Sequence, residues 1–242
     1  MARWFCCRRS SWLLTCDHAG PLHPVFCVVA EKRLSWSRPA APGFLANRMN
    51  TPKDLLEAYL EAKDLDRPSL IPECFTANAV LTYSIATDTI SFPNKVLGAD
   101  AIAQTLVRDF RKKFDRCKTY YVCDSIIDRG QRIDFMPWLV IMREASNSAL
   151  RVGKGYYKWE FESDETRMRV RAMHIYIERM DNIKDRDGKT LHALQSELPY
   201  PWLPPATLLE TFERLMKQAA GFAFLDVFKA PVGKQERTAR PP

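Results

Sequence analysis

The 242-residue sequence contains no apolar run near the roughly 18 residues that a membrane-spanning helix needs. It also lacks a Gly-x-Ser-x-Gly motif, a His-Glu-x-x-His motif and a dinucleotide-binding fingerprint. The Gly153-Lys154-Gly155 stretch does not have the spacing of a P-loop. The apolar share of 46% nevertheless suits an ordinary soluble core. We therefore expect one or two soluble domains and no membrane partner.

Acidic residues are scarce at both ends of the chain. Residues 1–48 carry a net charge of +5 and residues 229–242 carry +3, whereas residues 49–228 carry −1. The overall charge of +7 suggests a nucleic-acid partner at first sight, but it belongs almost entirely to the ends. Because the central part is nearly neutral, we expect no nucleic acid to bind there.

The seven cysteines are odd in number and dispersed, and no secretory signal precedes them. This pattern predicts free thiols in a reducing compartment, which indicates the cytoplasm. Four possible zinc ligands lie in Cys16-x-His18-x4-His23-x3-Cys27. Their spacing matches no common zinc finger or knuckle, so we predict neither a metal nor another cofactor.

A helix start follows the first 48 residues, which show no sustained period. Thr51 suits the N-cap position, Pro52 the first helical position, and Asp54 the first turn, where a carboxylate meets free N–H groups. We therefore predict that residues 1–48 are a disordered basic extension and that the folded chain begins at Met49. The sequence also allows Met49 to be the true initiator.

Helical periodicity comes first along the chain and strand alternation follows. The expected helices span 52–65, begin at Asp100, and follow Pro204 and Pro205. A strand is expected at 79–84, with 89–92 as its short partner. Four longer strands with turn-rich junctions are then expected at 118–128, 132–144, 149–163 and 167–180.

Short connections between these long strands predict an antiparallel meander. Pro137 predicts a bulge or an edge position in the second long strand. Gly153 and Gly155 predict bending of the third. On the last strand, Met173, Ile175 and Ile177 alternate with His174 and Tyr176, so the more apolar set is expected to face the core. These features predict a curved sheet.

This order of elements, helices followed by a bent antiparallel meander, resembles that of the nuclear transport factor 2-like superfamily. The superfamily includes SnoaL-like cyclases, ketosteroid isomerases and scytalone dehydratases. The resemblance rests on Leu55–Leu60, Val96–Ile102, Gly153–Trp159 and Val170–Ile177. It implies an α+β cone, in which a curved antiparallel sheet of about six strands wraps around N-terminal helices. A C-terminal helix is added. The expected domain covers 49–190, with a strap and helix at 191–228 and a flexible tail at 229–242.

The resemblance also implies an apolar pocket between the concave sheet face and the helices. His174 is the first candidate for acid–base catalysis near neutral pH, although a histidine hydrogen-bonded on the outer face, or one at a dimer contact, is the alternative. Tyr176 and Tyr157 are candidate catalytic hydroxyl donors, unless they serve packing alone. The residues expected to line the pocket are Tyr83, Trp138, Trp159, Arg143 and Phe110.

Two functions are compatible with such a pocket. The first is an isomerase, cyclase or dehydratase that acts on a small, apolar carbonyl compound without a metal. The alternative is a non-catalytic module that binds a small apolar ligand or a protein partner, and homodimerisation through the convex sheet face is expected from the resemblance. No carboxylate aligns with His174, which favours the alternative.

Overall fold

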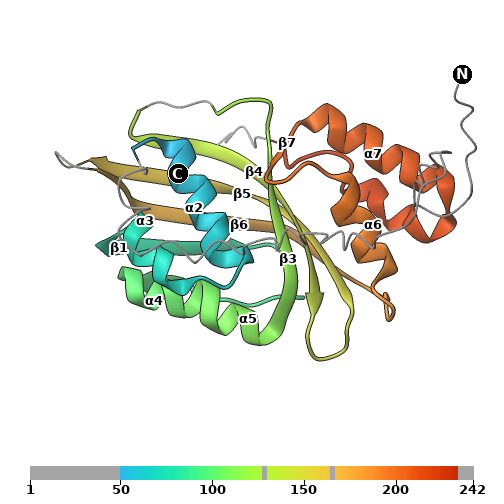
Figure 1. Cartoon of the computed structure of the whole chain (residues 1–242), viewed down its shortest axis with the longest axis horizontal. Coiled ribbons are helices and arrows are strands. Elements are labelled where there is room, and N and C mark those ends of the chain that lie inside the picture. Colours follow the sequence, from blue (N-terminus) through green and yellow to red (C-terminus); the bar gives the residue numbers. More distant parts are fainter. Residues whose placement is uncertain (1–49, 127–129, 164–166, 234–242) are drawn as a thin grey trace, which may run out of the picture. The chain divides into compact units, whose positions relative to one another are not determined.

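The computed structural model describes residues 50–126, 130–163 and 167–233 and has an α+β fold (Figure 1). The helical elements are α2 (Pro52–Asp64), η1 (Pro68–Leu70), α3 (Ile71–Cys74), α4 (Ala99–Ala103), a π-helical segment η2 (Gln104–Asp109), α5 (Phe110–Lys113), α6 (Lys189–Glu197), α7 (Pro205–Gln218) and η3 (Ala220–Val227). The strands are β1 (Phe75–Ile85), β2 (Lys95–Leu97), β3 (Phe114–Val122), β4 (Arg132–Glu144), β5 (Leu150–Ser163), β6 (Met168–Ile183) and β7 (Trp202–Leu203).

Helix α2 begins where the sequence predicts. The Asp54 backbone N–H donates to the Thr51 hydroxyl at 3.2 Å, and the Thr51 backbone N–H donates to the Asp54 carboxylate at 3.0 Å. This reciprocal capping box satisfies two backbone donors that a helix start would otherwise leave free. Its apolar stripe, formed by Leu55, Leu56 and Tyr59, is fully buried against the sheet.

The seven strands form one sheet in the order β2-β1-β6-β5-β4-β3-β7. The meander from β3 to β6 is antiparallel, as predicted. The sheet as a whole is mixed, because β1 pairs with β6 and β3 pairs with β7 in parallel. The expectation of a wholly antiparallel sheet of about six strands is wrong in this respect. Tight turns fix the direction of successive strands only, whereas long connections leave the direction of β1 and β7 open.

Two hydrophobic cores lie on the two faces of the sheet. Helices α2, α3, α4 and α5 cover one face, here called the inner face (Figure 1). Helices α6 and α7, together with η3, pack on the opposite, outer face of β3, β4 and β5. Alternation along β4 serves both cores, since Trp138 and Val140 point inward and Leu139 and Ile141 point outward. The prediction that Met173, Ile175 and Ile177 face the core is confirmed.

Two register shifts lie near the predicted positions, one with an extra residue in β4 and one with an extra residue in β6 opposite β5. The β4–β5 register shifts between Ile133 and Met136, next to Pro137. The β5–β6 register shifts between Lys154 and Gly155. Both are sites where an extra residue increases the local twist of a strand.

The C-terminal strap packs its aromatic rings on the body, as the sequence suggests. The Tyr200 ring lies edge-on to Tyr120, with centroids 5.7 Å apart, and the Trp202 ring lies 5.0 Å from that of Tyr121. Helix α6, which the sequence analysis missed, begins where the buried Asp185 accepts two backbone N–H groups of its first turn.

Two smaller expectations differ from the structure. Residues 89–92 form a loop rather than a strand, and Lys95–Leu97 pairs with β1 instead. The possible zinc ligands between Cys16 and Cys27 lie outside the described residues. The fold class itself, α+β with N-terminal helices packed on the sheet and an added C-terminal helix, is confirmed. Within the described ranges, no helix is long and apolar enough to cross a membrane.

Candidate functional site

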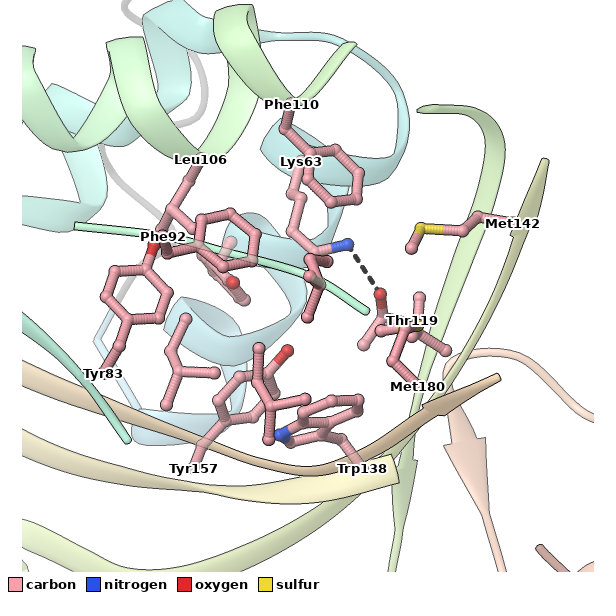
Figure 2. A pocket seen from close by; sticks show the side chains of 15 residues that line it. Lys63, Tyr83, Phe92, Leu106, Phe110, Thr119, Trp138, Met142, Tyr157 and Met180 are labelled. Carbon is pink, nitrogen blue, oxygen red and sulfur yellow. Dashed lines mark hydrogen bonds between the residues drawn. The ribbon is translucent and has the colours of Figure 1, made fainter. Parts of the chain in front are cut away.

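A small cavity of about 40 Å³ lies between the inner face of the sheet and the helices (Figure 2). Its lining is mostly aromatic and aliphatic. The lining residues are Tyr59, Lys63, Tyr83, Ile90, Phe92, Leu106, Phe110, Thr119, Trp138, Val140, Met142, Tyr157, Ile175, Ile177 and Met180. This volume holds only a few water molecules.

Helix α2 and strands β4 and β5 position most of the polar side chains of the cavity wall. Tyr59 and Lys63 lie four residues apart on α2 and therefore project from the same helix face. Trp138 and Tyr157 project inward from β4 and β5, and their rings stack at 5.6 Å. Gly155 makes room for Trp138, since a Cβ atom at Gly155 would lie 2.5 Å from the indole ring.

A buried ion pair closes one end of the cavity. The Lys63 and Asp64 side chains are only 7% and 1% exposed, and Lys63 Nζ lies 2.7 Å from Asp64 Oδ1. Lys63 also donates to the Thr119 hydroxyl at 2.7 Å, the contact drawn in Figure 2. The second carboxylate oxygen of Asp64 accepts the Thr119 backbone N–H at 2.7 Å and the Tyr200 hydroxyl at 3.1 Å. The pair thus joins α2, β3 and the strap.

The ionisable groups of the wall hold their protons. Burial disfavours the Lys63 ammonium, but the adjacent Asp64 carboxylate outweighs this effect and raises the pKa of Lys63 above its ordinary value. Burial also raises the pKa of Tyr59, Tyr83 and Tyr157 well above the ordinary tyrosine value. At neutral pH the wall therefore presents one cation and neutral phenols.

Three donors in the wall, the Tyr59 and Tyr83 hydroxyls and the Trp138 Nε1–H, have no hydrogen-bond partner among the described residues. All three are shielded from solvent. A buried donor without an acceptor costs about 1–3 kcal/mol, and such groups are uncommon in native proteins. All three belong to side chains that line the cavity. They are the strongest sign that this cavity binds something.

The loop between β1 and β2 closes the cavity over Tyr83. The Phe92 ring stacks on the Tyr83 ring with centroids 4.8 Å apart and planes 2° apart. The Thr89 hydroxyl donates to the Met180 carbonyl and anchors the loop to β6. Because Ile90 and Phe92 are partly exposed, this loop is the thinnest part of the wall.

The structure brings together half of the residues expected at the site. Tyr157, Tyr83, Trp138 and Phe110 line the cavity. Trp159 lies on the same sheet face but is fully buried behind Tyr59, with ring centroids 5.2 Å apart. Arg143 lies outside the cavity and forms a bidentate pair with Asp115, with Arg143 Nε 2.7 Å from the carboxylate.

His174 and Tyr176 lie outside the cavity, because alternation along β6 turns both to the outer face. His174 Nδ1 lies 2.8 Å from the Thr82 hydroxyl. The Tyr176 ring packs on that of Tyr156 at 4.8 Å. This placement corresponds to the alternative given for His174 above, a histidine hydrogen-bonded on the outer face.

The position of His174 predicts a pH effect on stability. Burial and, secondarily, the Lys158 ammonium lower the pKa of His174. The unfolded chain therefore takes up the proton first, so stability is complete above the ordinary histidine pKa of about 6.5 and falls as the pH drops below it. We expect urea denaturation to show this loss in the wild type and a smaller loss in His174→Gln. His192→Gln, at an exposed position, is the control, and an unchanged slope in His174→Gln would contradict the assignment.

Sequence reasoning missed Lys63 and Asp64. One signal was present: Lys63 follows Leu56 by seven residues and Tyr59 by four, which places a charge within the apolar stripe of α2. A lysine at such a position needs a buried counter-charge. That Asp64 provides it, with Thr119 from β3, depends on long-range packing.

The described residues contain no cluster of three or more His, Cys, Asp or Glu side chains that could hold a metal ion. Within the same ranges Cys117 is a buried free thiol and Cys123 is a partly buried one, and Cys74 is also buried. Burial raises the pKa of Cys117 to about 12, which keeps this neighbour of Lys63 in the thiol form.

No protein-family model and no curated protein matches the sequence. Solved structures are similar to about half of the chain. The structure of LinA is 11% identical in sequence, with a TM-score of 0.46. The match covers 54% of this chain and 86% of the LinA chain. A nuclear transport factor 2-like protein from Salmonella enterica has 14% identity and a TM-score of 0.41 over 55% and 88%. A ketosteroid isomerase-like protein from Erwinia carotovora has 11% identity and a TM-score of 0.41 over 52% and 92%. Such values say nothing about the activity of this chain.

Proposed function

We propose that the protein binds a small, mostly apolar carbonyl compound in the inner cavity, which must widen at the Ile90 and Phe92 side chains to admit it, because its 40 Å³ hold only a few water molecules. The observation that carries this proposal is the set of unpartnered donors, above all the Tyr83 hydroxyl and Trp138 Nε1–H, in a mostly apolar wall. A carbonyl oxygen accepts hydrogen bonds and donates none, so it complements such a wall. The apolar remainder of the ligand would contact Met142, Ile175 and neighbouring side chains.

Binding without chemistry is the form of this function that we favour. Acid–base catalysis on a carbonyl compound needs a group that accepts a proton near neutral pH. Among the described residues of the lining, the tyrosines and Lys63 retain their protons, and the carboxylate of Asp64 is engaged by Lys63, Thr119 and Tyr200. An isomerase, cyclase or dehydratase would need a base from elsewhere and is the second candidate.

Acetophenone and α-methylstyrene test the proposal, because they differ only in an oxygen atom that replaces a methylene group. We expect acetophenone to bind about tenfold more tightly in calorimetric titrations, since one or two hydrogen bonds separate the ligands. Exchange of the acetophenone methyl protons with D₂O, followed by NMR, reports any catalysis. Equal affinity for the two compounds would contradict the proposal, and catalysed exchange would favour the enzyme.

Tyr83→Phe separates a binding role from a structural one. Removing a buried, unpartnered hydroxyl should leave the free energy of unfolding unchanged or raise it by about 1 kcal/mol, while acetophenone affinity falls several-fold. Tyr120→Phe is the matched control, because its hydroxyl is also buried and unpartnered but belongs to the outer core. Affinity that falls equally in both variants would argue against a specific contact with Tyr83.

Homodimerisation and a cytoplasmic location stay predictions. The outer face is partly covered by α6, α7 and η3. We therefore expect any partner chain to contact the uncovered part, around His174 and Tyr176.

A further inference from the structure

A second cavity, of about 340 Å³, adjoins the inner one. Ile90, Phe92 and Phe110 line both cavities, so these three side chains form the partition between them. Two of them belong to the loop between β1 and β2, where the Phe92 ring stacks on Tyr83. Rotation of the Phe92 side chain would join the two cavities into one longer site.

Arg151, on β5, lines the second cavity and is only 5% exposed, which is rare for an arginine. Its Nη2 donates to the Thr89 carbonyl, and its guanidinium lies 6.0 Å from the centre of the Phe114 ring. Its Nε–H is shielded from solvent and has no partner among the described residues. A buried guanidinium hydrogen without an acceptor calls for an explanation.

Glu144, at the end of β4, lies beside Arg151 and also lines this cavity. Its Oε2 is 3.6 Å from Arg151 Nη1, which is close enough for an ion pair but too long for a hydrogen bond. The same oxygen is shielded and accepts no hydrogen bond within the described ranges. Two neighbouring side chains in the wall of the second cavity therefore have an unused donor and an unused acceptor, which small side-chain movements would turn toward a ligand.

Building on the proposed function, we propose that the ligand is an elongated hydroxy ketone, with its carbonyl oxygen at Tyr83 and Trp138 and its hydroxyl group at Arg151 and Glu144. A hydroxyl group accepts and donates, so one group satisfies both unused partners. The two cavities favour different chemical groups. The inner wall offers unused hydrogen-bond donors, whereas the wall of the second cavity has an unused donor and an unused acceptor.

A charged end group fits the second cavity less well. A carboxylate accepts but does not donate, and it would lie against the Glu144 carboxylate. An ammonium donates but does not accept, and it would lie against Arg151. Lys113 and Asp109 also line the cavity, but Lys113 is exposed and Asp109 already accepts from Gln104 and Lys112. The neutral hydroxyl is therefore the favoured group.

Three series of straight-chain methyl ketones, ending in a methyl, hydroxyl or carboxylate group, test this inference by calorimetry with the full chain. At the chain length that reaches the second cavity, the hydroxyl end should bind about tenfold more tightly than the methyl end. The carboxylate end should gain nothing over the methyl end. Glu144→Gln should remove the discrimination against the carboxylate, and Lys113→Gln is the control that should not.

Each outcome separates this inference from the proposed function. Suppose that ketones with methyl ends bind but a hydroxyl end adds no affinity at any chain length. The proposed hydroxyl site at Arg151 and Glu144 is then wrong, and carbonyl binding in the inner cavity is still supported. If a carboxylate end binds most tightly, the assignment of a neutral group is overturned. If no ketone of any series binds, the proposed function itself fails. Arg151→Met should remove the preference for a hydroxyl end over a methyl end. If that variant does not fold, the affinities of the three ligand series for the wild type test the inference alone.

Discussion

Asp64→Ala is expected to lower the free energy of unfolding by about 3–5 kcal/mol, because it leaves the Lys63 ammonium buried without its counter-charge. Both side chains are almost completely shielded from solvent. The carboxylate also accepts hydrogen bonds from Thr119 and Tyr200, so its loss would loosen β3 and the strap from α2. Denaturation in urea or guanidinium chloride, read at the transition midpoint, measures the effect.

Two further variants make this result interpretable. Asp88→Ala removes an exposed carboxylate from the loop between β1 and β2 and should change the midpoint little. Replacing both partners, as Lys63→Met with Asp64→Leu, should recover much of the loss, because an apolar pair of similar volume leaves no buried charge. A cost for Asp64→Ala no greater than that for Asp88→Ala would show that the pair contributes little.

The Lys63 side chain should keep its charge in this ion pair from neutral pH up to the ordinary lysine pKa. The pKa of Lys63 is raised in the folded protein by Asp64, against the effect of burial. A raised lysine pKa gives stability that is complete below the unfolded value of about 10.4 and is lost only as the pH rises through the folded value.

Gly155→Ala is the second change with a large expected effect. An added Cβ atom would lie 1.9 Å from the Tyr176 carbonyl oxygen and 2.5 Å from the Trp138 ring. The first contact is with backbone and cannot be relieved by a side-chain rotation, so β5 and β6 must separate locally. We expect a loss of about 3 kcal/mol or more, at the upper end of overpacking effects.

The same substitution should also disturb the cavity, because Trp138 occupies the space above Gly155 and forms part of the wall. Acetophenone affinity should therefore fall together with stability. Gly221→Ala is the matched control, since no atom lies within 4 Å of its added Cβ position. Thermal unfolding temperatures compare the two variants, and an equal temperature for both would refute the close packing described here.

Much of the fold could be predicted because its signals are local. The capping residues Thr51 and Asp54 mark the start of α2, and period-2 alternation marks β4, β5 and β6 within a few residues. The register shifts near Pro137 and Gly155 also follow from residue type. The short strand β2 and helices α6 and η3 were missed, because their residues carry weak local patterns and are fixed by contacts with distant strands.

The candidate site could be predicted only in part. The inward positions of Tyr157 and Trp138 follow from strand alternation once the apolar face is known. His174 and Tyr176 drew attention by residue type, yet alternation places them on the outer face. Arg143 is held by Asp115 on a neighbouring strand, a pairing that depends on the β3–β4 register.

The sequence by itself determined helix α2 and the long strands β4, β5 and β6, the order of helices before the meander, and the confinement of net positive charge to the ends of the chain, since each depends on residues near one another along the chain. The tertiary structure alone decided which sheet face is covered, how Lys63 and Asp64 become a buried pair against Thr119, and where Tyr83 and Trp138 keep unpartnered donors. These features join segments that lie tens of residues apart, and local periodicity contains no information about which distant side chain will meet a given one.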